Sequence, residues 1–191
     1  MSLRVISGSA KGRRLKSVPG KVTRPVTDRV KEALFNILGR DVIDSTWWDL
    51  FGGTGAVGIE SLSRGAAFVR FTDLDRGSIE TMNANLALTR LQERAETKRA
   101  DAFALLTTSP DRQFHYIYVA PPQYKELWSK AIYLLDNNPA WVAEDGWIIS
   151  QIDPKEFQQL ELKAFEQIDQ RKYGRTLLVF YGRKETPNGE G

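Results

Sequence analysis

The 191-residue sequence contains no cysteine, a single histidine and no long hydrophobic run. The lack of cysteine excludes disulfides, thiolate metal sites and cysteine nucleophiles. Because His115 is the one histidine, neither a histidine metal cluster nor a serine–histidine triad is expected, and we predict no metal. No run of about 18 apolar residues is present, which argues against a membrane-spanning helix. Met1–Gly8 lacks the apolar core of a secretory signal, so we expect a cytoplasmic protein.

The composition is that of one folded domain whose positive charge gathers at one end. Hydrophobic residues make up 41% and charged residues 27% of the chain, enough to bury a sizeable core. Residues 1–40 contain ten Lys or Arg and two acids, a net charge of +8, whereas the remainder carries −5. A basic end on a mildly acidic body is typical of an appendage that binds a polyanion. The alternative is a solvated basic face that binds nothing.

From residue 46 onward, short apolar segments alternate with longer amphipathic ones, which indicates alternating strands and helices. The expected strands are 47–51, 68–73, 97–99, 115–119, 147–152, 162–168 and 176–181, and the expected helices are 56–63, 78–91, 102–106 and 127–135. This order predicts an α/β fold with a doubly wound, mostly parallel, seven-stranded sheet. A turn at 170–174 predicts that the last two strands form an antiparallel hairpin.

The N-terminal region has its own pattern. Residues 4–18 contain two short apolar pieces around a Gly/Ser/Lys turn, which predicts a small hairpin. Thr27 or Asp28 can cap a helix in which apolar residues recur at helical spacing up to Leu38. The expected organisation is a basic extension of hairpin plus helix at 1–40, a main domain at 41–185 and a disordered tail at 186–191.

A glycine-rich loop follows the first predicted strand of the main domain. Gly53, Gly55 and Gly58 form a G-x-G-x-x-G pattern, and Asp73 follows Gly53 by 20 positions at the end of the next strand. Such a loop lets the backbone approach a ligand, and the acidic residue can bind ribose hydroxyls. The pattern serves either a dinucleotide or S-adenosylmethionine. Asp49, just before the glycines, would repel a pyrophosphate but suits a ligand with an ammonium group.

Two prolines follow the fourth predicted strand, in the run Val119-Ala-Pro-Pro-Gln-Tyr124. They end the strand and leave a rigid backbone with few donors, followed by an aromatic ring. Carbonyl acceptors beside a ring suit a nucleic-acid base, whose amino group donates while its face stacks. A strand end capped by prolines, without a ligand, is the alternative.

Three segments together resemble the RsmD family of bacterial methyltransferases, which act on guanine N2 of small-subunit ribosomal RNA. They are Arg24-Pro-Val-Thr-Asp-Arg-Val-Lys-Glu-Ala-Leu-Phe-Asn-Ile-Leu38, Asp49-Leu-Phe-Gly-Gly-Thr-Gly-Ala-Val-Gly-Ile-Glu60 and Ser63-Arg-Gly-Ala66. The opening Arg4-Val-Ile-Ser-Gly8 and Lys11-Gly-Arg-Arg-Leu15 fit the same family, and the resemblance extends over about residues 4 to 183. It implies a Rossmann-like, S-adenosylmethionine-dependent enzyme with a small RNA-binding extension.

The resemblance also implies roles for particular residues. The methionine part of the cofactor would lie against Asp49, Phe51, Gly53 and Gly55, the ribose against Asp73, and the adenine beside Asp101 and Ala102. Leu74 is expected at the same cofactor site. The residues expected to contact RNA phosphates are Lys11, Arg13, Arg14, Arg24, Arg29 and Lys31. The implied partner is ribosomal RNA in the small ribosomal subunit, and we expect a monomer.

The sequence departs from the family pattern at the expected catalytic segment, Ala120, Pro121, Pro122 and Tyr124. The family has Asp-Pro-Pro followed directly by Tyr or Phe, so the carboxylate is missing here and the aromatic residue is shifted by one. Loss of one acceptor for the target amine would slow transfer on the order of 10²-fold. Three interpretations follow: a slower enzyme, an enzyme with a substitute acceptor such as a backbone carbonyl, or an inactive homologue that binds the cofactor and RNA.

Activity is the interpretation we favour. Two other classes remain as alternatives. A dinucleotide-dependent oxidoreductase would account for the glycines and Asp73, but not for Asp49 or the basic N-terminal region. A non-catalytic RNA-binding protein would account for Ala120.

Overall fold

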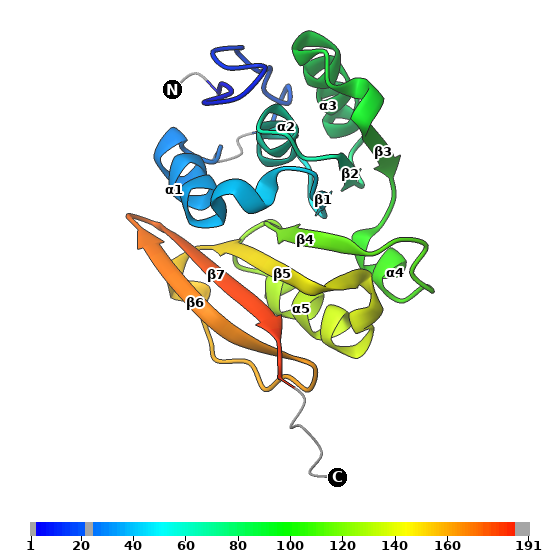
Figure 1. The fold of residues 1–191 in the computed structure, drawn as a ribbon, viewed down its shortest axis with the longest axis vertical. Coiled ribbons are helices and arrows are strands. Elements are labelled where there is room, and N and C mark those ends of the chain that lie inside the picture. Colours follow the sequence, from blue (N-terminus) through cyan, green and yellow to red (C-terminus); the bar gives the residue numbers. More distant parts are fainter. Residues whose placement is uncertain (1–2, 22–24, 186–191) are drawn as a thin grey trace.

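A computed structural model describes residues 3–21 and 25–185. The strands are β1 Thr46–Asp49, β2 Phe68–Asp73, β3 Ala95–Arg99, β4 Phe114–Val119, β5 Val142–Ile152, β6 Phe165–Tyr173 and β7 Thr176–Arg183. They form one sheet in the order β3-β2-β1-β4-β5-β7-β6 (Figure 1). The first five are parallel to one another, and β7 is antiparallel to both β5 and β6. The predicted sheet and its antiparallel hairpin are therefore confirmed.

Helices cover both faces of the sheet. They are α1 Asp28–Leu38, α2 Ala56–Ser63, α3 Arg76–Thr89, α4 Ala102–Leu106 and α5 Leu127–Asn137, with short 3-10 helices at Gly39–Val42, Gln92–Arg94, Pro139–Trp141 and Pro154–Glu156. One hydrophobic core lies between the sheet and α1, α2 and α3, and the other lies between the sheet and α4 and α5. Trp47 and Trp48 are fully buried and enter opposite cores, because consecutive side chains of a strand point to opposite faces.

Helix α1 begins where the sequence allowed two possible caps. The Oγ1 atom of Thr27 accepts a hydrogen bond from the backbone N–H of Val30 at 3.2 Å, so Thr27 is the N-cap. The predicted apolar stripe is buried along the helix, with Leu34 and Leu38 in the core. Asp28 instead forms a surface ion pair with Arg4, at 2.8 Å.

The N-terminal segment packs onto α2. Its predicted hairpin is present as a single antiparallel bridge between Arg4 and Arg14, without regular strands. The buried carboxylate of Glu60 accepts the backbone N–H groups of Ile6 and Ser7 at 2.9 and 3.1 Å, which replaces the hydrogen bonds that a partner strand would supply. A Cβ atom on Gly8 would meet the Ser63 carbonyl oxygen at 1.8 Å, so only glycine allows this close approach.

Several boundaries at the C-terminal end differ from the predicted ones: strand β6 begins at Phe165 rather than at 162, and β7 ends at Arg183 rather than at 181. Strand β5 begins at Val142 rather than at 147, and its pairing with β4 shifts register between Phe114 and Tyr116. The polar residues inside this irregular stretch hide it from a hydrophobic pattern. Strand β6 continues to Tyr173, so the turn lies at 174–175 rather than over 170–174. Pairing with β7 keeps these polar residues extended, because an edge strand can face solvent.

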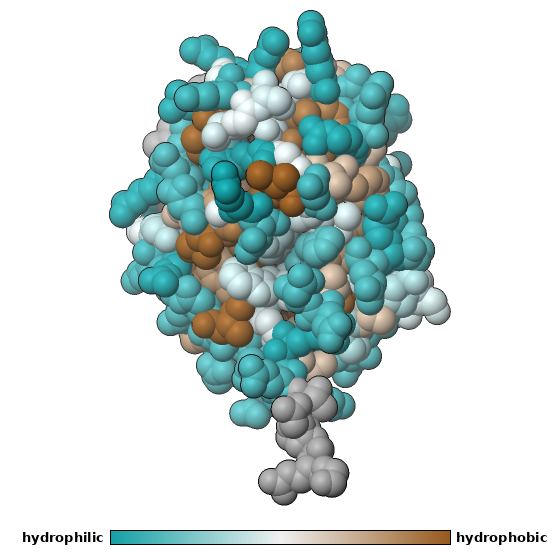
Figure 2. Space-filling model, in the orientation of Figure 1, coloured by the Kyte–Doolittle hydropathy of each residue, from teal (hydrophilic) through white to brown (hydrophobic). Residues whose placement is uncertain are grey.

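The visible surface carries mostly hydrophilic side chains, with hydrophobic ones in small separate groups (Figure 2). Among the residues that the structure describes, no helix is long and apolar enough to cross a membrane.

Candidate functional site

A cavity of about 690 Å³ opens at the carboxyl ends of β1, β2 and β4. The loops that follow these strands line it on one side, and the segment before α1 lines it on the other, through Val18, Lys21, Pro25 and Val26. The carboxyl edge near the middle of an open parallel sheet is where such folds bind ligands, because the loops there diverge to either side. The cavity is therefore the first candidate for a functional site.

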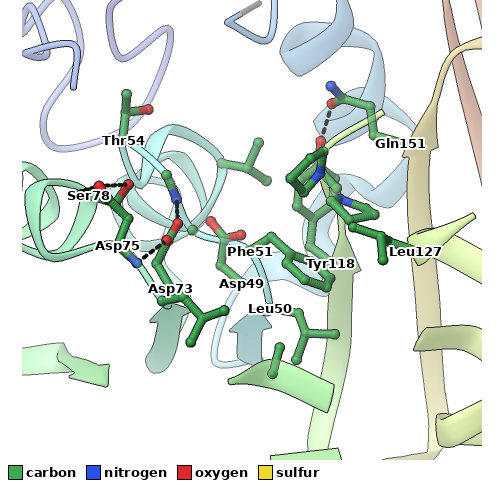
Figure 3. Close-up of a pocket in the computed structure, with 18 of the residues that line it drawn as sticks. Asp49, Leu50, Phe51, Thr54, Asp73, Asp75, Ser78, Tyr118, Leu127 and Gln151 are labelled. Atoms are coloured by element: carbon green, nitrogen blue, oxygen red, sulfur yellow. Dashed lines mark hydrogen bonds between the residues drawn. The ribbon is translucent and has the colours of Figure 1, made fainter. Parts of the chain in front are cut away.

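The glycine loop after β1 closes one end of this cavity. Gly53 and Gly55 have φ values of 57° and 79°, which glycine adopts at no steric cost, and Gly55 is the N-cap of α2. The Gly53 N–H donates to Oδ2 of Asp73 at 3.0 Å, and the Asp75 N–H donates to Oδ1 at 2.9 Å (Figure 3). Asp73 thus holds the loop in place, and its carboxylate retains lone pairs that can accept from a ligand.

Asp49 ends β1 and lines the cavity with a side chain that is almost entirely buried. Its Oδ2 accepts the Gly58 N–H at 3.4 Å. Burial raises the pKa of Asp49 to about 8; the Gly58 hydrogen bond opposes this shift, and the charge of Asp73 adds to it. A cationic group in the cavity would stabilise the ionised carboxylate, so this position suits an ammonium.

An apolar slot lies beside the ends of β2 and β3. Leu74 is 64% exposed at its rim, and the ring centroid of Phe51 lies 5.6 Å from that of Phe103. Asp101 caps α4 by accepting the Phe103 N–H at 2.9 Å, and Ala102 is buried behind it. A flat aromatic ligand could occupy such a slot between hydrophobic side chains.

The turn after β4 forms the other end of the cavity. It is lined by Ala120, Pro121 and Pro122 and then by Tyr124, a residue that is 63% exposed and has a φ of 63°. The Tyr124 hydroxyl donates to Asp153 Oδ2 at 2.7 Å, and its N–H donates to Glu156. Residues after β5 therefore hold a ring whose face remains free to stack.

Nearly all predicted cofactor and catalytic residues line this one cavity. The exception is Gly55, the N-cap of α2, which does not line it. Sequence reasoning missed Tyr118 and Gln151, which also line it and are joined by a hydrogen bond from the Tyr118 hydroxyl to Gln151 Oε1 (Figure 3). The sequence did hold one sign of Gln151: it is a polar residue near the end of an otherwise apolar strand segment.

The predicted RNA-contacting residues divide into three groups. Lys11, Arg13, Arg14 and Arg29 are exposed on the N-terminal segment and α1. Arg24 lies outside the described residues. Lys31 is a correction: its ammonium is fully buried, 3.5 Å from Glu60 Oε2, and donates to the Arg4 carbonyl, so it cannot reach a phosphate. The apolar pattern of the helix did not predict this burial, because it does not show that a lysine beside the apolar stripe pairs with a buried acid on another helix.

A further cation lies near Tyr124. Arg175, at the tip of the β6–β7 hairpin, is exposed and close enough to Tyr124 and Asp153 to influence the pKa of both. The same hairpin tip reaches α1, where the Arg29 guanidinium lies 6.0 Å from the centroid of the Tyr173 ring. The hairpin tip thus carries one exposed arginine, Arg175, and contacts a second, Arg29, through Tyr173.

The segment before α1 is tied to the cavity at two points. Lys21 Nζ lies 3.1 Å from both Asp75 Oδ2 and Ser78 Oγ at the start of α3. The buried Asn85 amide accepts the Lys16 N–H and donates to the carbonyls of Lys16 and Thr54. The N-terminal segment and the glycine loop therefore share one side chain. No group of three His, Cys, Asp or Glu side chains that could hold a metal occurs within residues 3–21 and 25–185.

The seven-stranded sheet with its antiparallel β7, together with acidic residues after β1 and β2 in one cavity, defines a Rossmann-like methyltransferase. Residues 3–182 match the family model described as "Conserved hypothetical protein 95". The chain belongs to this family, the RsmD-type methyltransferases, as the sequence resemblance predicted.

Two curated relatives and one solved structure illustrate the match. The Bacillus subtilis protein "Putative rRNA methyltransferase YlbH" is 42% identical over 79% of this chain and 83% of its own. The Escherichia coli "Ribosomal RNA small subunit methyltransferase D" is 34% identical over 76% of this chain and 72% of its own. The structure of "Putative methyltransferase yhhF from Escherichia coli" superposes with a TM-score of 0.85 at 29% identity, covering 96% of this chain and 99% of that one.

Proposed function

We propose that this protein uses S-adenosylmethionine to methylate the exocyclic N2 of a guanine in small-subunit ribosomal RNA. The observation that carries the proposal is the cavity that joins Asp49 and the glycine loop at one end to the Pro121-Pro122 turn and Tyr124 at the other. A methyl donor and a base can meet there within one open cavity. The printed names of the relatives support ribosomal RNA as the substrate class.

The residues around the glycine loop fit S-adenosylmethionine. Asp49 would hold the ammonium group, Asp73 the ribose hydroxyls, and the slot beside Leu74 and Phe51 the adenine. S-adenosylmethionine supplies a methyl group made electrophilic by its sulfonium. The pyrophosphate of a dinucleotide would instead lie near Asp49, whose buried carboxyl group offers no positive charge to an anion and repels it when ionised. The oxidoreductase alternative is therefore disfavoured on electrostatic grounds.

The residues at the other end of the cavity would orient the base. The Tyr124 ring would stack on it, with the phenol fixed by Asp153 so that little freedom is lost on binding. The proline pair keeps the carbonyls of the turn rigid beside the base edge. Holding amine and methyl group in line is the main contribution that a protein makes to such a displacement.

The exposed basic residues would position the RNA through its phosphates. Lys11, Arg13 and Arg14 on the N-terminal segment and Arg29 and Arg175 beside the cavity form the proposed contact surface. Phosphate contacts fix orientation, whereas the pocket recognises the base. Arg175 was not expected from the sequence, and it adds a cation from the opposite end of the chain.

Transfer of labelled methyl groups tests the proposal. S-adenosylmethionine labelled in its methyl group is incubated with small subunits, and separately with naked small-subunit RNA, both lacking the modification. Label is expected on guanine N2 at one nucleotide, which nuclease digestion and mass spectrometry identify. Calorimetric titration with S-adenosylmethionine and with NADH is the control. Cofactor binding without label on either RNA would reject the proposed reaction and favour a non-catalytic homologue.

A further inference from the structure

We propose that Gln151, held by Tyr118, accepts the hydrogen bond of the target amine and so replaces the polar side chain that Ala120 does not provide. The inference rests on the proposed function and assigns a substrate-contacting residue to the same site. Both side chains line the cavity, and their hydrogen bond lies on the side away from Asp73 (Figure 3).

Sheet register brings Gln151 next to Ala120. Val119 of β4 pairs with Ser150 of β5, so the residues that follow, Ala120 and Gln151, lie side by side on the same face. Neighbouring strands are about 4.8 Å apart, a gap that the long glutamine side chain can span. Alanine leaves the space in front of the proline turn empty. The Gln151 amide is therefore positioned to fill the place of a polar side chain at residue 120.

The other polar side chains at this end of the cavity are less suitable as acceptors. The Tyr124 hydroxyl, which donates to Asp153 at 2.7 Å, is a weaker acceptor than an amide oxygen because its lone pairs are conjugated with the ring, and the two prolines have no polar side chain. Gln123 belongs to the turn itself and has no strand to fix it. Gln151, in contrast, is anchored in β5 and half-buried. Its Oε1 has two lone pairs, of which Tyr118 uses one.

Tyr118 acts as a positioning residue. It is buried in β4, and the same burial, together with the charge of Asp49, raises its pKa well above the usual value. The phenol therefore keeps its proton and donates to Gln151 across the working pH range. An amide group can adopt two orientations that exchange its oxygen and nitrogen. The hydrogen bond from Tyr118 selects the orientation in which Oε1 of Gln151 faces Tyr118.

A bound acceptor matters because the guanine amine is conjugated with its ring and is a weak nucleophile. A hydrogen bond from one N–H to Gln151 Oε1 orients the nitrogen and stabilises the positive charge that develops on it. The nitrogen gains the methyl group as the N–C bond forms and the S–C bond breaks; it loses one proton to solvent water, and the sulfonium becomes a neutral thioether. Gln151 stays unchanged throughout.

Five proteins test the role: wild type, Gln151→Met, Gln151→Glu, Ala120→Asp and the double variant Gln151→Met/Ala120→Asp. Methionine keeps the side-chain volume but removes the acceptor. Single-turnover transfer to unmodified small-subunit RNA should fall on the order of 10²-fold in Gln151→Met. Gln151→Glu should stay within about tenfold of wild type, because a carboxylate also accepts from both Tyr118 and the amine.

The double variant distinguishes an acceptor from a merely structural residue. Asp at position 120 returns an acceptor to the same space, so it should restore transfer at least about tenfold over Gln151→Met. Ala120→Asp alone, where Gln151 is still present, should change transfer less. Calorimetric affinity for S-adenosylmethionine should be the same in wild type and Gln151→Met, because this substitution changes no charge in the cavity. Unchanged transfer in Gln151→Met, or no recovery in the double variant, would overturn the inference.

An equilibrium measurement gives a second readout. RNA hairpins carry either guanine or inosine at the nucleotide that wild type methylates, and inosine lacks only the N2 amine. With S-adenosylhomocysteine present, wild type should bind the guanine hairpin about tenfold more tightly, as one hydrogen bond implies. Gln151→Met should bind the two equally; retained discrimination would refute the assignment. If wild type methylates no RNA, the proposed function fails; if it methylates but Gln151→Met does so equally, only this inference fails.

Discussion

Replacing Asp49 with asparagine should stabilise the free protein while weakening its binding of S-adenosylmethionine. Asparagine keeps the shape of the side chain and its acceptor for the Gly58 N–H, but carries no charge. In the wild type, burial raises the pKa from 3.8 to about 8. At neutral pH the folded state therefore holds a proton that the unfolded state releases, and the free energy of this proton uptake opposes folding.

The sign and size of the effect follow from this pKa. Below pH 3.8 the Asp49 carboxyl is protonated in both the folded and the unfolded state. In that range this group contributes no pH dependence to the free energy of unfolding. Between this value and about 8, only the folded state holds the proton, and wild-type stability falls by about 1.4 kcal/mol per pH unit relative to Asp49→Asn. Between pH 5 and pH 7 the two proteins should diverge by about 3 kcal/mol.

Urea unfolding of both proteins at pH 5, 6 and 7, without cofactor, measures this difference. All other ionisable groups are shared, so their contributions cancel in the comparison. A difference in unfolding free energy that stays constant over this range would refute the argument, because it would mean that Asp49 is ionised at low pH. Calorimetry in buffers of different ionisation enthalpy is the complementary assay. The wild type should release about one proton per S-adenosylmethionine bound at pH 7, whereas Asp49→Asn should release none and bind at least about tenfold more weakly.

Three further predictions concern the rest of the molecule. Glu60→Ala should lower the unfolding free energy by about 3–5 kcal/mol in urea titrations, because Lys31 is left buried without its counter-charge; a loss below 1 kcal/mol would contradict the ion pair. The double variant Arg13→Glu/Arg14→Glu should weaken RNA binding and leave cofactor affinity unchanged. In anisotropy titrations at several salt concentrations, the salt dependence of RNA binding should decrease by an amount that corresponds to about two phosphate contacts. Equal binding would make these residues a solvated face. Tyr124→Ala should reduce transfer on the order of tenfold or more through lost stacking, whereas Tyr124→Phe, which loses only the Asp153 hydrogen bond, should lose less.

The parts of the fold that could be predicted are those governed by local pattern. The helix over 56–63 and the strand over 68–73 have their predicted bounds, because apolar periodicity and glycine limits coincide there. The same holds for the cofactor end of the cavity, whose residues follow directly after strands. The prediction for strand β5 was too short, because the first half of the strand is polar and pairs irregularly with β4. Pairing between strands that are distant in the sequence cannot be predicted from local sequence patterns.

The residues that sequence reasoning misplaced depend on contacts between distant segments. Lys31 has the composition of a surface cation, and only the buried carboxylate on α2 makes it internal. Gln151 has no motif, and it matters only because β4 and β5 are paired in the register that sets it beside Ala120. Arg175 comes near Tyr124 only because β6 extends to Tyr173 and brings the hairpin tip to this side. Each position follows from strand pairing or burial rather than from residue spacing.

The contacts of Asn85 give the basic N-terminal segment a structural role in addition to the proposed contact with RNA. Its amide bonds both the Lys16 backbone and the Thr54 carbonyl, so the N-terminal segment and the glycine loop are held by the same buried group. Displacement of the segment would remove the two hydrogen bonds with Lys16, and the Asn85 amide would then be held by Thr54 alone among these partners. A typical intramolecular hydrogen bond contributes about 0.5–1.5 kcal/mol. The loop conformation that suits the cofactor is therefore most stable when the extension is docked. RNA bound to the exposed basic face of the segment, as proposed, would favour the same docked arrangement, and the Asn85 hydrogen bonds would then couple RNA binding to the glycine loop.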